Sequence, residues 1–451
     1  MTTFERLKKA GLFNRNVPRY TSYPTAPHFH AGVARKEFAS WLADLDPVFP
    51  VSMYIHIPFC ERLCWFCACR TQGVSSLTPV EAYLETLLAE IAMFKASRPT
   101  GLRLARLHFG GGSPTILSPE MIDRLIGAVR DAIAFDPECE FSVEIDPTAC
   151  NDAKLDAFAR GGMNRASIGV QDFNENVQAA IGRPQGYDLT AKTVAALRER
   201  GIKSINIDML YGLPFQDLPA LESTTRQVIS LHPDRVALFG YAHVPWMAKR
   251  QKMINEDSLP GPTERLRQAQ KAAEIFTDAG MVPVGIDHFS RPQDSLAIAA
   301  QNNGLRRNFQ GYTDDRCNAL IGIGASSISR FPQGYIQNNT ATINYSKSIK
   351  DQNWPAVRGY KMTTDDKIRA RAIEMLMSEF KLDLNQLEAE FGVSVADIHD
   401  ECFRAIAEFK GFVSLENNCL SISAAGRPLT RLIANVFDTF TTAQAKHSRA
   451  V

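Results

Sequence analysis

The chain has 451 residues, of which 45% are hydrophobic and 22% charged, the composition of an ordinary soluble globular protein with two or three domains. Its 50 basic and 49 acidic residues leave a formal net charge of +1, so no overall field attracts nucleic acid or an anionic membrane surface. No apolar run is long enough for a membrane span, and the N-terminus lacks the layout of a signal peptide. We therefore expect a cytoplasmic protein.

Strand patterns alternate with amphipathic helix patterns from about residue 51 to residue 290. The first predicted helix has Thr78 as its N-cap and Glu81 closing a capping box. Alternation at this spacing predicts a parallel sheet with right-handed crossovers, either open or closed partly or fully into a barrel. The predicted strands cover residues 51–57, 104–109, 141–145, 165–170, 204–210 and 235–241, and the helices begin near residues 78, 118, 152, 190, 218 and 263.

The character of the sequence changes after about residue 362. A helix is predicted from residue 363, followed by two more helical stretches and a hairpin, which together suggest a small winged-helix-like domain. Residues 363–451 carry ten Lys and Arg against thirteen Asp and Glu, or −3, whereas a DNA-binding wing is expected to be basic. We therefore predict no nucleic-acid binding and divide the chain into an N-terminal segment (1–48), a catalytic domain (49–362) and a C-terminal domain (363–451).

Four of the nine cysteines fall within ten residues, directly after the first predicted strand: Cys60, Cys64, Cys67 and Cys69. Three thiols in one loop with aromatic neighbours suit an iron–sulfur cluster, and ligation by only three of them would leave one iron open to a cofactor. Two alternatives stay open from the residues alone. One is a set of buried, reduced cysteines without metal, and the other is zinc, although structural zinc sites usually use two separated pairs.

Other polar and glycine-rich positions follow the ends of the predicted strands. Gly110, Gly111 and Gly112 follow the second strand, and Glu144 and Gln171 lie at the ends of the third and fourth. Because the carboxyl ends of parallel strands meet at one edge, these positions predict a single active-site rim. Taken singly, each is better explained by a tight turn or an ordinary hydrogen bond.

The cysteine loop, Cys-x3-Cys-x2-Cys after a first strand, resembles the signature of the radical S-adenosylmethionine (SAM) enzymes. Within that superfamily, residues 56–60 together with Cys69 resemble the oxygen-independent coproporphyrinogen III dehydrogenase family. The resemblance implies an incomplete parallel (β/α)6 TIM-like barrel with an N-terminal strap and a small C-terminal helical, winged-helix-like domain. Further matching segments occur in the same order at residues 18–25, 110–115, 144–147, 169–173, 206–208, 211–214, 241–243 and 307–312.

The resemblance also implies a reaction and its cofactors. Two propionate side chains of coproporphyrinogen III are converted to vinyl groups, which gives protoporphyrinogen IX in heme biosynthesis, by a 5′-deoxyadenosyl radical made from SAM. It implies one 4Fe–4S cluster on Cys60, Cys64 and Cys67, two SAM molecules per chain, and a catalytic role for Glu144, while Cys69 has no assigned role. The SAM-binding residues implied are Tyr54, Phe66, Gly111, Gly112, Ser113, Glu144, Gln171, Arg183, Asp208, Ala242 and Ile328.

A flexible tetrapyrrole with four carboxylates needs basic anchors and an aromatic floor. The N-terminal segment around Arg19 is predicted to cover the barrel mouth and to exclude water and oxygen. We expect a monomer that receives electrons from a reductase or flavodoxin-type donor. The rival hypotheses are a heme chaperone, a radical methyltransferase or another heme-modifying relative, and a zinc-stabilised binding module. The substrate candidates are Arg19, Tyr20, Tyr23, Arg307, Phe309, Gln310 and Tyr312.

Overall fold

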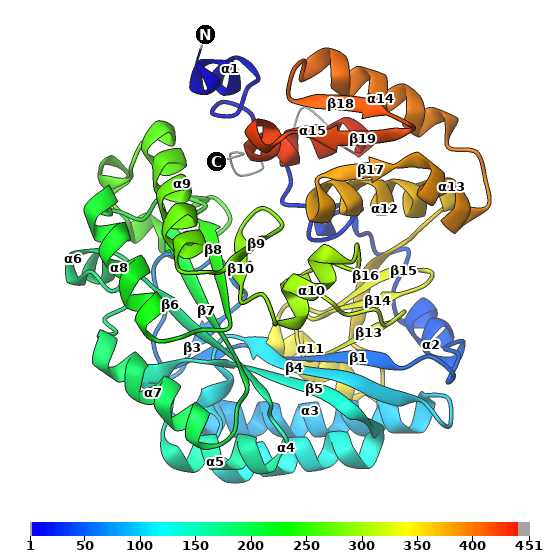
Figure 1. Ribbon diagram of the computed structural model, residues 1–451. Coiled ribbons are helices and arrows are strands. Elements are labelled where there is room, and N and C mark those ends of the chain that lie inside the picture. Colours follow the sequence, from blue (N-terminus) through cyan, green and yellow to red (C-terminus); the bar gives the residue numbers. More distant parts are fainter. Residues whose placement is uncertain (1, 441–451) are drawn as a thin grey trace.

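One twelve-stranded sheet organises most of the computed structural model, which describes residues 2–440 (Figure 1). All six predicted strands are present, and each is parallel to the next along the chain. Within the described residues the sheet ends in two edge strands, so the parallel strands form an incomplete barrel, as the resemblance implied. The six strands are β1 (Val51–Ile57), β4 (Arg103–Gly111), β5 (Ala134–Ile145), β6 (Arg165–Gln171), β7 (Ser204–Tyr211) and β8 (Arg235–Gly240).

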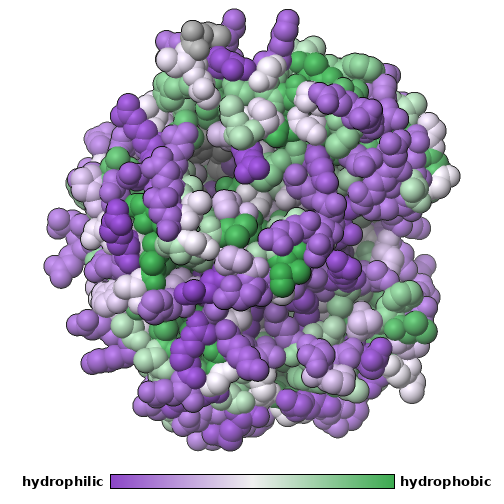
Figure 2. Space-filling model, in the orientation of Figure 1, coloured by the Kyte–Doolittle hydropathy of each residue, from purple (hydrophilic) through white to green (hydrophobic). Residues whose placement is uncertain are grey.

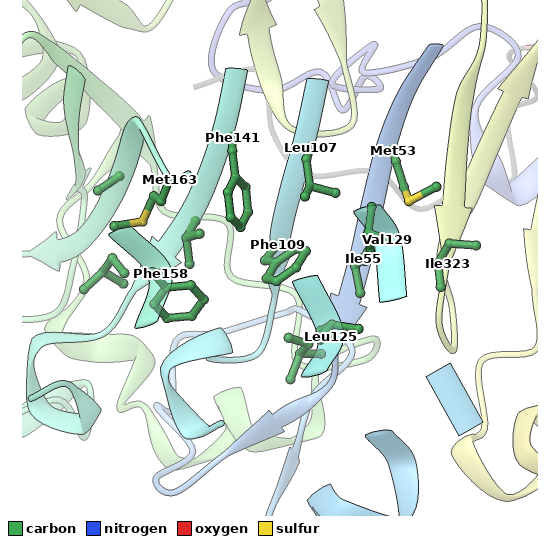
Figure 3. Close-up of a cluster of buried hydrophobic side chains, with 14 of the residues drawn as sticks. Met53, Ile55, Leu107, Phe109, Leu125, Val129, Phe141, Phe158, Met163 and Ile323 are labelled. Atoms are coloured by element: carbon green, nitrogen blue, oxygen red, sulfur yellow. The ribbon is translucent and has the colours of Figure 1, made fainter. Parts of the chain in front are cut away.

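Helices connect the parallel strands and cover their outer face (Figure 1). Figure 3 shows the core beneath them, where Leu107, Phe109 and Phe141 of the sheet lie close to Leu125 and Val129 of α4. The rings of Phe109 and Phe141 lie 5.0 Å apart. Because burial of each such side chain contributes about 1.5–3 kcal/mol, this outer layer holds the barrel together and leaves its interior free for polar residues. The helices are α3 (Thr78–Ser97), α4 (Pro119–Ala132), α5 (Asp152–Arg160), α7 (Tyr187–Glu199), α8 (Leu218–Ser230) and α9 (Pro262–Asp278).

Two predicted helix starts were wrong. Helix α3 has Leu77, in helical conformation, as its N-cap, so Thr78 lies inside the helix and forms no capping box. The Glu81 N–H donates instead to the Leu77 carbonyl, as in any first helical turn. Helix α7 begins at Tyr187, three residues before the predicted start, because Gly186 adopts the extended N-cap conformation there.

Six strands beyond the predicted ones extend the sheet at both edges. On one side β13 (Leu320–Ile323) is parallel to β1. Strands β14 (Ile328–Phe331), β15 (Gly334–Asn338) and β16 (Ala356–Lys361) follow in antiparallel order. On the other side β10 (His288–Ser290) and β9 (Val282–Val284) are antiparallel to β8 and to each other. These short strands at the edges carry little hydrophobic periodicity of their own, so pairing rather than local sequence defines them.

The C-terminal part contains helices and a small sheet, as predicted. Strand β18 (Val413–Glu416) and strand β19 (Cys419–Ile422) form the hairpin, and β17 (Lys381–Asp383) pairs with β19. Asn417 and Asn418 both have positive φ, +51° and +61°, which a two-residue type I′ hairpin turn requires. The helices are α12 (Thr364–Glu379), α13 (Leu384–Phe391), α14 (Ala396–Glu408) and α15 (Thr430–Ala434).

The N-terminal segment contacts both hydrophobic cores. Leu12 and Val17, after α1 (Thr3–Lys9), are buried with the side chains of the C-terminal helices. Phe38, on α2 (Arg35–Ala43), is buried in the barrel core. The segment therefore connects the C-terminal core to the barrel. Figure 1 shows α1 beside the C-terminal helices.

Short elements complete the described chain. Strand β2 (Phe59–Cys60) pairs with β3 (Gln72–Gly73), and β11 (Arg306–Asn308) pairs with β12 (Gly311–Thr313). The short helices are α6 (Glu175–Ala180), α10 (Ser295–Gln301) and α11 (Thr342–Lys350). Between residues 2 and 440, no helix combines the length and apolarity that a membrane crossing requires. The face in Figure 2 is mostly hydrophilic, with apolar side chains in scattered groups.

Candidate functional site

The carboxyl edge of the parallel strands collects the predicted rim residues. Ile57, the last residue of β1, lies opposite Gly111, the last residue of β4. Farther along the sheet, Glu144 of β5 lies opposite Ser167, and Gly169 of β6 lies opposite Asp208 of β7. The structure therefore brings residues from five neighbouring parallel strands to one edge, where the cysteine loop also begins.

The cysteine loop starts on β2 and is held against the neighbouring loop. Cys64 is buried, Cys60 and Cys67 are half-buried, Cys69 is exposed, and none of the four is in a disulfide. The backbone N–H of Cys69 donates to Cys67 Sγ at 3.4 Å. Hydrogen bonding from Cys69 lowers the pKa of Cys67 to about 6, whereas burial raises the pKa of Cys60 to about 12. The loop therefore holds thiols of unequal acidity.

The donor set of the loop fits an iron–sulfur cluster. Among the described residues, no three His, Cys, Asp or Glu side chains converge on one point, as ligands of a single ion would. In a 4Fe–4S cluster each thiolate binds a different iron, so its ligands stand apart around one loop. Trp65 and Phe66 pack against a buried group that includes Val177 and Ile181. This apolar surround limits the access of water to the loop.

Arg183 places a buried guanidinium beside the thiols. Its Nη1 lies 3.4 Å from Cys64 Sγ and 3.6 Å from Asp146 Oδ2, and its Nη2 donates to the Gly169 carbonyl at 2.8 Å. Burial acts to lower the pKa of Arg183, but Asp146 and Cys64 raise it overall. Its Nε is buried without a hydrogen-bond partner. A charged guanidinium with a spare N–H is suited to bind a carboxylate.

Glu144 is held ionised at the centre of the rim. Its Oε2 accepts from the Gly111 N–H at 3.0 Å, and its Oε1 lies 3.4 Å from His108 Nε2. Burial acts to raise the pKa of Glu144, but the hydrogen bond and charge of His108 and the Gly111 N–H hold it below its ordinary value. Such a carboxylate can accept hydrogen bonds from an ammonium or hydroxyl group of a ligand.

Two glycines are required by the close approach of β4 to β1 and the cysteine loop. Gly111 has φ +116°, and a Cβ there would lie 2.5 Å from the His56 ring. A Cβ on Gly112 would lie 2.5 Å from the Phe59 carbonyl oxygen, and the Gly112 N–H donates to the Ile57 carbonyl at 2.8 Å. Side chains at these positions would therefore push the cysteine loop away from the sheet.

Aromatic and polar side chains continue the rim into the barrel. The Tyr54 ring stacks on His108 with centroids 5.7 Å apart, and its hydroxyl lies 2.9 Å from His56 Nδ1. Asp208 accepts from Asn206 at 2.8 Å and from Ser167 at 3.2 Å. Burial and the neighbouring Glu144 raise the pKa of Asp208 to about 6.

The other predicted SAM residues lie around this group. Gln251 Nε2 donates to the carbonyls of Phe66, at 2.7 Å, and Ala242, at 3.1 Å, and so joins the cysteine loop to the end of β8. Ser113 is buried with its Oγ 2.7 Å from Thr115 Oγ1. Gln171 ends β6 with φ +69°.

Ile328 belongs to the same region through strand packing. Gly322 lies opposite Tyr54, and a Cβ on Gly322 would meet the Ile328 backbone at 2.9 Å. The start of β14 therefore lies close to the β1 side of the rim.

Comparison with known proteins agrees with this geometry. A family model described as the Radical SAM superfamily matches residues 54–224. An oxygen-independent coproporphyrinogen III oxidase from Cereibacter sphaeroides (strain ATCC 17025 / ATH 2.4.3) is 52% identical over 451 residues, which is 100% of each chain. The Paracoccus denitrificans enzyme of that name is 48% identical over 446 residues, 99% of each chain.

A solved structure is similar as well. The coproporphyrinogen III oxidase of Escherichia coli, described as a radical SAM enzyme, matches with a TM-score of 0.90 and 35% identity, covering 95% of this chain and 100% of that chain. Identity at this level over the whole length decides the family. This chain belongs to the oxygen-independent coproporphyrinogen III oxidases.

A cavity of about 910 Å³ adjoins the rim in this member of the coproporphyrinogen III oxidases. Ala242 lines it from the end of β8, Arg19 from the N-terminal segment, Arg307 from β11, and Phe380 from the C-terminal part. Its cationic side chains are Arg19, Arg265, Arg307, Arg427 and Arg431, and its carboxylates are Glu256 and Asp287. The cavity therefore reaches the ends of β7 and β8, and its lining has more arginines than carboxylates.

The other substrate candidates have different surroundings. The Tyr20 hydroxyl donates to Asp438 at 2.9 Å, Tyr23 contacts Thr439 at 3.0 Å, and the Tyr312 hydroxyl donates to the Met377 carbonyl at 2.5 Å. These hydroxyls tie the N-terminal segment and the barrel to the C-terminal part. Tyr20 and Tyr23 line a second cavity of about 610 Å³, and Arg307 lines both cavities.

Phe309 and Gln310 lie away from the first cavity. Phe309 packs edge-on against Tyr335 with ring centroids 6.0 Å apart, and Gln310 is exposed. Of the seven substrate candidates, the structure thus brings Arg19 and Arg307 into the cavity that adjoins the rim.

Three arginines of the first cavity were not singled out from the sequence. Arg265 lies on α9, and Arg427 and Arg431 lie in or next to α15. Each stands in an ordinary amphipathic or turn segment, and only the packing of the C-terminal part on the barrel brings them together. No local signal identified them.

Proposed function

We propose that this chain catalyses the oxygen-independent oxidative decarboxylation of coproporphyrinogen III to protoporphyrinogen IX in heme and porphyrin biosynthesis. Each of two propionates loses CO2 and two hydrogens and becomes a vinyl group. The proposal is supported by the family membership and by relatives named for this activity. The observation that carries it is a cation-lined cavity that reaches Ala242, whose carbonyl is joined through Gln251 to the carbonyl of Phe66 in the cysteine loop.

Cys60, Cys64 and Cys67 would hold one 4Fe–4S cluster. When bound, a reduced cluster supplies the electron that cleaves the sulfonium of SAM and yields a 5′-deoxyadenosyl radical. Trp65 and Phe66, within the loop, pack against Val177 and Ile181 and so limit the access of water to this chemistry. Cys69 holds the backbone N–H that contacts Cys67, and its thiol has no role in the proposal.

The rim residues have properties that suit a methionine zwitterion and a nucleoside. We assign the carboxylate to Arg183, whose Nε has no protein partner, and the ammonium to Glu144. Gly111 and Gly112 allow backbone groups to approach the ligand, while Gln171 and Asp208 suit ribose or adenine. Two propionates each require one hydrogen abstraction, which favours two SAM molecules per chain. The remaining residues assigned to this site are Tyr54, Phe66, Ser113, Ala242 and Ile328.

We assign residues 49–362 to the catalytic domain, residues 1–48 to a segment that covers it, and residues 363–451 to a C-terminal domain. Residue 1 and residues 441–451 lie outside the described residues. Free cysteines are typical of a reducing compartment, and the described cysteines are all free, so we propose a cytoplasmic enzyme. It would act as a monomer and receive electrons from a reductase or flavodoxin-type protein.

Turnover under anaerobic conditions tests the proposal. Protein reconstituted with iron and sulfide is incubated with dithionite, SAM and coproporphyrinogen III, and the porphyrins are analysed by mass. The expected products have lost CO2 and two hydrogens once and then twice. Tight heme binding without vinyl formation would instead indicate a chaperone. A product heavier by a methyl group would indicate a methyltransferase. Bound zinc without SAM cleavage would indicate a zinc-stabilised binding module.

A further inference from the structure

Two side chains share one backbone carbonyl near the end of β6. The Gly169 carbonyl accepts from Arg183 Nη2 at 2.8 Å and from Gln185 Nε2 at 3.0 Å. The space around it is narrow, since a Cβ on Gly169 would lie 3.2 Å from Arg183 Nη2. Because a carbonyl oxygen has two lone pairs, Gln185 occupies one of them and confines Arg183 to the other.

The amide of Gln185 has one favourable orientation. Gln185 is 2% exposed, and its Nε2 also donates to Thr190 Oγ1 at 3.1 Å. Its Oε1 is buried without a hydrogen-bond partner. Rotation of the amide by half a turn would place Oε1 against the Gly169 carbonyl oxygen, so that two acceptors would face each other. The NH2 group is therefore held toward Gly169, although this leaves the amide oxygen unsatisfied.

Gln178 of α6 holds the backbone around both residues. Its side-chain amide accepts from the Gln185 N–H at 2.9 Å and donates to the Gln185 carbonyl at 2.6 Å. Its own backbone carbonyl accepts from the Arg183 N–H at 2.9 Å. Pro184, between the two residues, has its φ fixed by its ring. The loop therefore presents Arg183 and Gln185 to Gly169 in a defined arrangement.

The contacts of Arg183 determine where its free N–H points. Its Nη1 lies 3.4 Å from Cys64 Sγ and 3.6 Å from Asp146 Oδ2, while its Nη2 is held by Gly169. Because the guanidinium is planar, contacts at Nη1 and Nη2 also fix the direction of Nε. This Nε is the buried donor without a protein partner. Loss of the contact with Gly169 would let the plane turn and would misdirect Nε.

We infer that Gln185 is a positioning residue for Arg183, which directs the guanidinium toward the methionine carboxylate of SAM by sharing the Gly169 carbonyl. The inference rests on the proposed function for the identity of the ligand. Gln185 acts through Gly169 and Arg183, and not by contact with SAM. Affinity for the carboxylate should therefore depend on Gln185 only while Arg183 is present. A residue that merely stabilised the fold would affect every ligand of the site.

Ligand binding to the full-length reconstituted protein tests this inference. The cluster is kept oxidised, so that SAM is not cleaved, and binding is measured by calorimetry. The two probes are SAM and its decarboxylated analogue, in which a hydrogen replaces the methionine carboxylate. Gln185→Leu removes the amide donor at similar volume and should raise the dissociation constant for SAM about 3- to 10-fold, the range for one neutral hydrogen bond. It should leave the dissociation constant for the analogue unchanged.

Two further variants sharpen the test. In an Arg183→Ala background, Gln185→Leu should cause no further loss of SAM affinity, because no guanidinium remains to be directed. Gln185→Glu keeps the shape of the side chain but replaces its NH2 group by an oxygen, and the added carboxylate competes for Arg183. It should weaken SAM at least as much as Gln185→Leu without weakening the analogue. This variant keeps the test open should Gln185→Leu not fold.

Ser52→Ala is the control for a general loss of stability. Ser52 is 2% exposed and donates to Asp315 at 2.5 Å at the amino end of β1, whereas the rim lies at the carboxyl end. Removal of this buried hydrogen bond should lower the unfolding temperature. The variant should bind both probes as the parent protein does.

Three results would overturn the inference. The first is unchanged SAM affinity in both folded Gln185 variants. The second is equal weakening of SAM and the analogue, and the third is a double variant in which the two losses multiply. None of these measurements needs turnover, so failure of the proposed function shows separately, as the absence of vinyl product from the parent protein.

Discussion

The rim at the strand ends and the cavity beside it are built in opposite ways. At the rim, the charged groups have protein partners: Glu144 contacts His108 and Gly111, and Arg183 contacts Asp146 and Cys64. In the cavity, Arg307 keeps two buried donors without partners. The rim therefore holds most of its charged atoms by protein contacts, leaving the Nε of Arg183 without a partner, whereas two buried N–H groups of Arg307 in the cavity have none.

The two regions also differ in how the chain builds them. The rim uses consecutive strand–helix units of one sheet, so each residue reaches the site through its own strand. The cavity uses three parts of the chain that are far apart in sequence, represented by Arg19, Arg307 and Arg431. We infer that a cofactor common to a superfamily is held by the shared sheet, while the specific substrate is recognised by segments added around it.

Loss of a thiol in the cysteine loop should have the largest effect. Changing Cys60, Cys64 or Cys67 to Ser removes a thiolate ligand, so iron and sulfide content should fall and vinyl formation should drop to background. Iron analysis and anaerobic turnover measure this. Cys419→Ser, a half-buried thiol on β19, serves as the control and should retain both. Retention of cluster and activity in all three loop variants would remove the ligand assignment.

Removal of the rim guanidinium should have the next largest effect. Arg183→Ala removes the buried guanidinium assigned to the methionine carboxylate, and the dissociation constant for SAM should rise about 10- to 100-fold. Equilibrium binding of SAM to the reconstituted protein measures this. Arg160→Ala removes a surface cation paired with Asp123 and should leave SAM affinity unchanged. Unaltered affinity in Arg183→Ala would exclude Arg183 from the site.

A substitution in the N-terminal segment tests whether this segment belongs to the C-terminal core. Leu12 is 0% exposed in that core, so Leu12→Ala should lower the free energy of unfolding by about 2–5 kcal/mol. Leu189→Ala, at an exposed leucine on α7, should change it by less than about 0.5 kcal/mol. Thermal unfolding distinguishes them, and equal effects would place the segment outside the core.

Deletion of the N-terminal segment tests its function as a cover. Removing residues 1–24 should lower vinyl formation while the cluster remains. The deletion also takes away the core side chains of Leu7, Leu12 and Val17, so the unfolding temperature should fall with it. Full turnover by the truncated protein would contradict a covering role.

The smallest effect should come from the buried carboxyl of Asp208. Its pKa is raised from 3.8 to about 6 by burial and by Glu144, so the folded protein retains a proton that the unfolded chain releases. The stability that this proton adds is present below about pH 4 and is lost as the pH rises through about 6. In Asp208→Asn the free energy of unfolding should therefore change less between pH 4 and 6 than it does in the parent protein. The difference between the two changes should be about 1–3 kcal/mol, after allowance for the partial exposure of the side chain. An unchanged pH profile would contradict the raised pKa.

The rim could be predicted from the sequence because its signals are local. The six parallel strands are marked by apolar runs, and Cys60, Gly111 and Glu144 stand directly at their ends. Parallel pairing then brings strand ends together without further information. The family resemblance added Arg183 and Asp208, whose single-residue signals are weak.

The cavity could not be predicted in the same way. Arg265, on α9 of the barrel, and Arg431, in the C-terminal part, come together only when that part packs on the barrel, and neither stands in a motif. Tyr20, Tyr23 and Tyr312 have the polar and aromatic character of substrate residues, yet their hydroxyls bond to the C-terminal part. The edge strands β9 and β13–β16 escaped prediction for a related reason, since partners distant in the chain define them.

The most direct test of the account is transfer of hydrogen from the substrate to the cofactor product. Coproporphyrinogen III is deuterated at the propionate carbons next to the pyrrole rings and incubated anaerobically with the reduced protein and SAM. If rim and cavity are two halves of one active site, deuterium should appear in 5′-deoxyadenosine as vinyl groups form. Formation of 5′-deoxyadenosine without deuterium, while vinyl product accumulates, would contradict it.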